Sequence, residues 1–115
     1  MLIKQIPIRN DLRNYMYLLA CENTSDAIAI DPLDHAKCLK VADELGWTIK
    51  TVANTHHHHD HIGGNDQVIA ATGAKLVAHK DAMDSIPGVN TGLIAGDDLQ
   101  CGEITLKVMD TPGHT

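Results

Sequence analysis

Residues 55 to 61 form a run of histidines with one aspartate, Thr-His-His-His-His-Asp-His. Four of its members have the spacing H-x-H-x-D-H: His56, His58, Asp60 and His61. In extended backbone alternate side chains point to the same side, so the first three can face one way. His61 can join them if the chain turns at the aspartate. Imidazole nitrogen and carboxylate oxygen bind zinc at about 2.0–2.2 Å. Four such groups exceed what one catalytic metal takes from protein, which indicates two adjacent metals.

Histidine runs also occur in purification tags and in low-complexity tracts that bind metals loosely. Tags lie at chain ends. This run instead lies in mid-chain, between the apolar stretch at Ile49–Ala53 and the pair Gly63-Gly64. Its position and spacing favour a dedicated metal site over both alternatives.

The elements that must position this run alternate between strands and helices. The first helix is expected to follow a cap at Asp34 and to end at Gly46. Its apolar stripe is Cys38, Val41, Ala42 and Leu45. In chain order, the pattern predicts strands at 3–8, 14–21 and 27–31, a helix at 34–45, a strand at 49–54, a helix at 66–71, a strand at 75–79, and a hairpin of 99–101 and 104–109. This order predicts an α/β (α+β) chain with a mixed sheet covered by helices and with ligand loops at strand ends.

Length, charge and cysteine content limit the possible domain number, partners and cellular location. A chain of 115 residues is expected to form one domain, residues 1–115. A formal charge of -6 without a basic stripe argues against a nucleic-acid partner. Three widely spaced cysteines, Cys21, Cys38 and Cys101, predict reduced core thiols rather than a disulfide framework. Apolar runs stay short of the roughly 20 residues of a membrane span, and no leader pattern opens the chain, so we expect a cytoplasmic protein without membrane contact.

Three segments together resemble one family, the metallo-β-lactamase-fold hydrolases, and within it glyoxalase II, the hydroxyacylglutathione hydrolases. They are the His run, Gly63-Gly64-Asn65 and Thr111-Pro112-Gly113-His114-Thr115. Asp31-Pro32 matches the aspartate that precedes the family's His motif, although Leu33 replaces the glycine often found next. The resemblance covers essentially the whole chain. It implies an αββα sandwich, of which this chain supplies the first, amino-terminal half.

The resemblance also implies the ligands of two divalent metals. The first metal would be held by His56, His58 and His114, and the second by Asp60 and His61. Asp31 would orient the His loop from behind a metal-bound imidazole. Asp60 is also the implied catalytic residue, because it can orient the nucleophile. A bridging aspartate and a further His ligand of the family fall beyond Thr115.

The implied reaction is hydrolysis of an S-acylglutathione thioester, a small-molecule substrate. Two metals would lower the pKa of a shared water from about 15.7 towards about 7, and the hydroxide would attack the carbonyl. Zinc is the expected metal, with iron and manganese as alternatives. Alternative functions in the superfamily are lactonase, persulfide dioxygenase and nuclease, the last disfavoured by the acidic charge. A further alternative is a catalytically incomplete metal-binding half-domain, which associates with itself or with the missing half.

Overall fold

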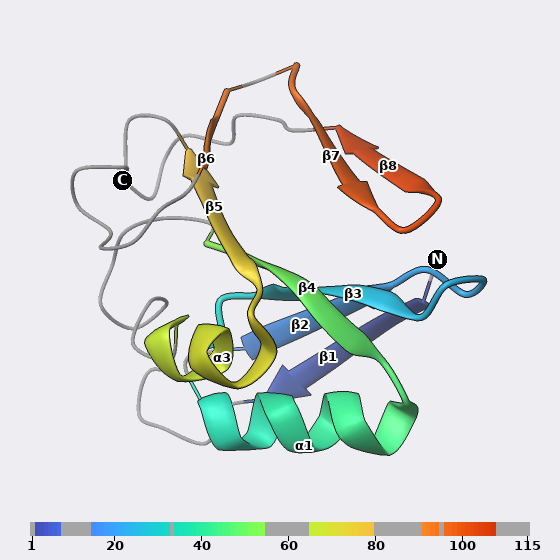
Figure 1. The fold of residues 1–115 in the computed structure, drawn as a ribbon, viewed down its shortest axis with the longest axis vertical. Helices are drawn as coiled ribbons and strands as arrows, with labels where there is room; N and C mark the ends of the chain where they lie inside the picture. Colours follow the sequence, from blue (N-terminus) through green and yellow to red (C-terminus); the bar gives the residue numbers. More distant parts are fainter. Residues whose placement is uncertain are drawn as a thin grey trace.

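The computed structural model describes residues 2–7, 15–32, 34–54, 65–79, 91–94 and 96–107. In this part of the chain, six strands form one sheet in the order β1-β2-β3-β4-β5-β6 (Figure 1). Their bounds are β1 Leu2–Pro7, β2 Tyr15–Ala20, β3 Asp26–Ile30, β4 Thr48–Ala53, β5 Lys75–His79 and β6 Thr91–Leu93. The sheet is mixed, as predicted: β1, β2 and β3 pair antiparallel, whereas β3 to β6 pair parallel.

In the described part of the chain, two helices lie between the parallel strands. Helix α1 (His35–Leu45) joins β3 to β4, and helix α3 (Asn65–Thr72) lies between β4 and β5. Both helices pack against one face of the sheet (Figure 1). These helices are the crossovers that parallel strands need. Because β3, β4 and β5 are parallel, their carboxyl ends all lie at the same edge of the sheet. Neither described helix has the length and apolar character needed to cross a bilayer.

Helix α1 begins and ends at the predicted residues. The Asp34 carboxylate accepts a hydrogen bond from the Lys37 backbone N–H at 3.2 Å, which satisfies one free donor of the first turn. Gly46 ends the helix in the left-handed conformation, with φ +72°, and its N–H donates to the Asp43 carbonyl at 3.1 Å. Glycine adopts this conformation without the penalty that a Cβ would bring.

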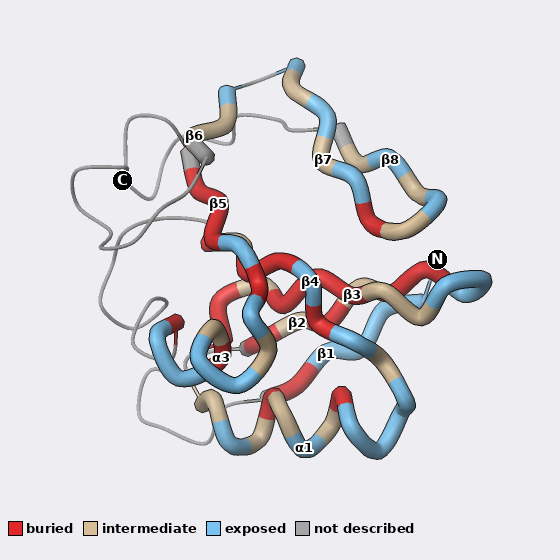
Figure 2. The backbone as a smooth tube through the Cα atoms, viewed as in Figure 1, coloured by how far each residue is buried: buried red, intermediate tan, exposed pale blue. Residues whose placement is uncertain are grey.

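The core lies between the helices and the sheet, as the distribution of buried residues in Figure 2 shows. It consists of Ile6, Met16, Leu18, Ala20, Ala27, Ala29, Cys38, Ala42, Ile49, Val52, Val68, Ala74, Leu76 and Ala78. The prediction that Leu45 completes the apolar stripe of α1 is wrong, because its side chain is 44% exposed. Leu45 is the last helical residue, and Trp47, beyond the turn at Gly46, packs against the core instead.

A separate hairpin lies across the sheet from the helices (Figure 1). It pairs β7 (Asp98–Cys101) with β8 (Ile104–Lys107). Ile104 and Leu106 are half-buried and Thr105 is exposed, the alternation that is typical of a strand with one covered face. The predicted continuation to residue 109 lies outside the described residues. Strand β6 was not predicted; the other predicted ends that fall on described residues agree to within one residue.

Candidate metal centre

The His run leaves the sheet at the edge where parallel strands end. Ile30, the last residue of β3, pairs with Ala53, the last residue of β4, and Ala53 pairs with Val77 of β5. The run begins at Thr55, just after this edge. The loops after β3 and β4 therefore start side by side (Figure 1). Loops at the carboxyl ends of parallel strands are where α/β sheets commonly bind ligands.

Asp31, the predicted orienting residue, lies at this edge directly after β3. Its side chain is buried, with 4% exposed. Its backbone has φ +52°, a left-handed conformation that costs most non-glycine residues roughly 1–2 kcal/mol and that aspartate adopts more readily than most. The Asp31 N–H donates to the Ala53 carbonyl at 2.9 Å, so the turn after β3 is fastened to the end of β4. Asp31 is thus fastened to Ala53, which precedes Thr55 by two residues in the sequence.

Two buried asparagines connect the ends of the His loop. Asn54 and Asn65 exchange two side-chain hydrogen bonds: the Asn65 Nδ2 donates to the Asn54 Oδ1 at 2.6 Å, and the Asn54 Nδ2 donates to the Asn65 Oδ1 at 3.1 Å. Their side chains are 6% and 3% exposed. The Asn54 N–H also donates to the Val77 carbonyl at 3.1 Å, which ties the pair to β5. The two residues that flank segment 55–64 are therefore held together.

This asparagine pair was missed by the sequence analysis. The signal was present, because one asparagine precedes Thr55 and the other follows Gly64. A local pattern, however, does not reveal that two amides on either side of a loop face one another. Buried amides need hydrogen-bond partners, and here each amide supplies the other. The pair fixes the end of β4 against the start of α3.

The predicted metal ligands do not belong to the part of the chain that the structure describes. They are His56, His58, Asp60, His61 and His114, and all five lie outside the described residues. Among the residues that the structure does describe, no three His, Cys, Asp or Glu side chains are grouped as metal ligands. The ligand set therefore stays a prediction, while Asp31, Asn54 and Asn65 form the described frame around it.

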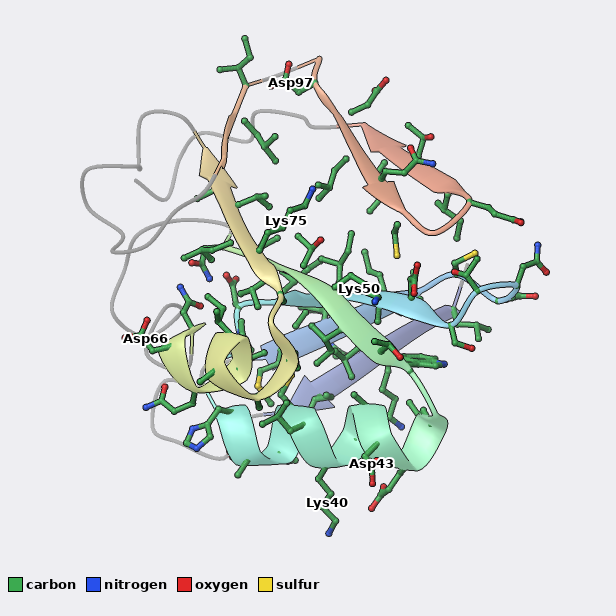
Figure 3. All side chains as sticks on the ribbon, in the orientation of Figure 1. Lys40, Asp43, Lys50, Asp66, Lys75 and Asp97 are labelled. Atoms are coloured by element: carbon green, nitrogen blue, oxygen red, sulfur yellow. The ribbon has the colours of Figure 1, made fainter. Side chains whose placement is uncertain are left out.

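Two further groups on the helices, the Asp66 carboxylate and the Cys38 thiol, have structural roles. Asp66 lies in the first turn of α3, where its carboxylate opposes the positive end of the helix dipole (Figure 3). Burial, followed by the nearby Asp34 charge, raises the pKa of the Cys38 thiol to about 11. Cys38 is therefore protonated at neutral pH and is not a competing nucleophile.

Comparison with known proteins gives one family. The family model described as the metallo-beta-lactamase superfamily matches residues 10–115. A hydroxyacylglutathione hydrolase of Nitrosococcus oceani is 53% identical over 116 aligned residues, which cover 100% of this chain. The same alignment covers 44% of that relative, so the chain spans less than half the length of this curated relative.

Solved structures agree with this result. The crystal structure of ETHE1 from Myxococcus xanthus superposes with a TM-score of 0.88 at 31% identity, over 100% of this chain and 50% of that one. A metallo-beta-lactamase from Staphylococcus aureus gives a TM-score of 0.84 at 35% identity, over 100% of this chain and 36% of its own. Both matches extend over the whole chain, including the edge that carries Asp31 and the asparagine pair.

Proposed function

The chain belongs to the metallo-beta-lactamase superfamily, and we propose that it is the metal-binding, amino-terminal half of a glyoxalase II-type hydrolase. The expected fold class and family resemblance are confirmed. The observation that carries the proposal is the position of the H-x-H-x-D-H motif, which directly follows the carboxyl end of β4 beside Asp31. The 53% identity to a hydroxyacylglutathione hydrolase supports S-acylglutathione thioesters as the substrate class.

The donor set fits a pair of divalent metals. Three imidazoles, His56, His58 and His114, are proposed to hold one metal, and Asp60 with His61 the other. Nitrogen and carboxylate oxygen donors suit a borderline ion, so zinc is the proposed metal. The hydrogen bonds between Asn54 and Asn65, which flank residues 55–64, support this assignment, because a segment held at both ends loses less conformational entropy when its side chains converge on an ion.

Each protein group has a proposed task in the hydrolysis. Bound divalent metals supply a water of lowered pKa and polarise the thioester carbonyl. Asp60 orients the attacking water towards the carbonyl carbon. Asp31 holds a His-loop imidazole in one orientation and tautomer from behind. The thiol leaving group departs as a thiolate of moderate basicity, so a strong general acid is not required.

The rest of the site is proposed to come from sequence outside residues 1–115, which we treat as one domain of a larger fold. The chain spans 44% of its Nitrosococcus oceani relative. The missing part would add the bridging aspartate, the last His ligand and the residues that contact glutathione. It would also pack on the sheet face opposite α1 and α3. The partial coverage of this relative favours a second candidate, a metal-binding half-domain that catalyses nothing until it pairs with such a part.

Hydrolysis assays of two proteins separate these candidates. One is the 115-residue chain, and the other is the same chain fused to the remainder of the Nitrosococcus oceani relative. Both are loaded with zinc, and release of free thiol from an S-acylglutathione is followed. We expect turnover by the fusion and its loss in the His58→Ala fusion. Turnover by the short chain at the rate of the fusion would contradict the half-domain candidate. A zinc-loaded fusion that hydrolyses no thioester would contradict the glyoxalase II proposal.

A further inference from the structure

Two of the three buried thiols meet where the β7–β8 hairpin contacts the turn between β2 and β3. The Cys101 Sγ–H donates to the Asp26 carbonyl, with sulfur and oxygen 3.2 Å apart. The Cys21 backbone N–H donates to the same carbonyl at 2.9 Å. The Asp26 carbonyl oxygen therefore accepts hydrogen bonds from both cysteines. The Cys101 sulfur and the Cys21 nitrogen are separated by at most these two hydrogen bonds. Figure 1 shows the hairpin turn beside the β2–β3 turn.

The contact between the two turns depends on a glycine. A Cβ at Gly102 would lie 3.1 Å from the Cys21 Sγ and 2.8 Å from its Cβ, and it would overlap the Thr24 hydroxyl. Because Gly102 has no side chain, the residue next to Cys101 packs directly on the Cys21 side chain. The same turns are joined by the Asn23 side-chain amide, which donates to the Glu103 carboxylate at 2.8 Å. The hairpin is thus docked on Cys21 by several independent contacts.

The two thiols differ in acidity. The Thr24 side chain, through its hydrogen bond to the sulfur, is the main cause that lowers the pKa of Cys21 to about 7. Burial raises the pKa of Cys101 above its ordinary value. Oxidants attack thiolates rather than thiols, and the neighbouring thiol then displaces the oxidised group. Cys38 differs from both, because it is buried in the core between α1 and the opposite face of the sheet.

We propose that Cys21 and Cys101 form a hydroperoxide-sensitive dithiol, which closes to a disulfide between the β2–β3 turn and the β7–β8 hairpin. The Cys21 sulfur takes one oxygen from the peroxide as its O–O bond breaks, giving a sulfenic acid and one water. The Cys101 sulfur then attacks the Cys21 sulfur, the S–O bond breaks, and a second water leaves. In total two thiols and one hydrogen peroxide give one disulfide and two waters. This site does not depend on the proposed hydrolase activity.

The disulfide would lock the hairpin onto the sheet. It would close a loop from Cys21 to Cys101 that contains β3 to β7 and both described helices, and a long closed loop restricts the unfolded chain strongly. The expectation that all three cysteines are buried is confirmed. The geometry adds a redox role for two of them.

Peptide mapping tests the proposal on the purified chain itself. The reduced protein is treated with a small excess of hydrogen peroxide, free thiols are blocked, and the digest is analysed by mass spectrometry. We expect a Cys21–Cys101 crosslinked peptide that is reversed by dithiothreitol, with Cys38 still free. The oxidised chain should also melt about 5 °C or more above the reduced chain.

Single variants separate the two thiols. Cys38→Ala should form the crosslink as the unaltered chain does. Cys101→Ala should stop at the sulfenic acid on Cys21, which dimedone traps, and Cys21→Ala should slow oxidation of the remaining thiols at least tenfold. A crosslink that contains Cys38, or no intramolecular crosslink in the unaltered chain, would overturn the proposal. The mapping of the unaltered chain decides this even if a variant fails to fold.

Discussion

Replacing Asn65 by alanine tests whether the asparagine pair fixes the loop that carries the His run. Asn65→Ala removes both hydrogen bonds of the pair, at 2.6 and 3.1 Å, and takes the Asn65 partner away from the buried amide of Asn54. A typical hydrogen bond contributes about 1 kcal/mol net, and a buried polar group that loses a partner adds a further cost of about 1–3 kcal/mol. We therefore expect the free energy of unfolding to fall by about 3–5 kcal/mol.

The metal site should respond as well as the fold. Without the pair, Asn54 and Asn65 no longer hold the two ends of segment 55–64 together, so ordering this segment around an ion costs more conformational entropy. Outer partners of metal ligands typically contribute 10- to 100-fold in affinity, and we expect a loss of about tenfold in zinc affinity. A purely structural role for the pair would lower stability and leave this affinity unchanged.

Urea unfolding of the metal-free chain and zinc titration against a competing chelator measure the two effects. Gln67→Ala is the matched control, because Gln67 is an exposed amide on the same helix and should change stability by less than about 0.5 kcal/mol. The double variant Asn54→Ala/Asn65→Ala should lose about 1–2 kcal/mol less unfolding free energy than the sum of the losses in the two single variants. Equal effects of Asn65→Ala and Gln67→Ala, or strict additivity in the double variant, would refute the reasoning.

Three further predictions concern the metal ligands, the Cys38 thiol of α1 and the hydrophobic core. His58→Ala should remove most of the bound metal, whereas His57→Ala should retain it; a large loss in the second would put the ligand register wrong by one. The pKa of Cys38 is raised from 9.0 to about 11 in the folded chain, so the unfolded chain loses the thiol proton first as the pH rises. The free energy of unfolding should therefore fall between about pH 9 and pH 11. Urea unfolding at several pH values should show a smaller fall in Cys38→Ala. Leu76→Ala should cost about 2–5 kcal/mol in unfolding free energy, because its side chain is fully buried, and Leu45→Ala less than about 0.5 kcal/mol; similar losses would contradict the assigned core.

The sequence predicted the local elements well, because their signals are local. Helix α1 has a capping carboxylate at Asp34 and a terminating glycine at Gly46, and both act through neighbouring backbone groups. The error at Leu45 has the opposite origin. Its spacing fits the apolar stripe, but the position of Trp47 after the turn decides which side chain covers the core. Strand β6 was missed because Thr91–Leu93 is too short to show an alternating pattern.

The candidate site shows the same division. The ligand types and their spacing are local, and they predicted a metal site. The resemblance to the family, carried by local motifs, implied that Asp31 orients the His loop, and this role stays a prediction. The asparagine pair needs the folded arrangement, because Asn54 and Asn65 meet only when β4 and α3 pack together. The Cys21–Cys101 contact is more distant still along the chain, and odd cysteine counts carry no information on which thiols meet.

Metal content per chain tests the central claim most directly. The purified 115-residue chain is loaded with zinc, desalted and measured by elemental mass spectrometry, with His58→Ala in parallel. The account predicts close to two zinc ions per chain, and a clear loss in the variant, because three of the proposed ligands in this chain hold one metal and two hold the other. One metal or none in the unaltered chain, or equal metal content in the variant, would contradict the assignment of a binuclear centre to this chain.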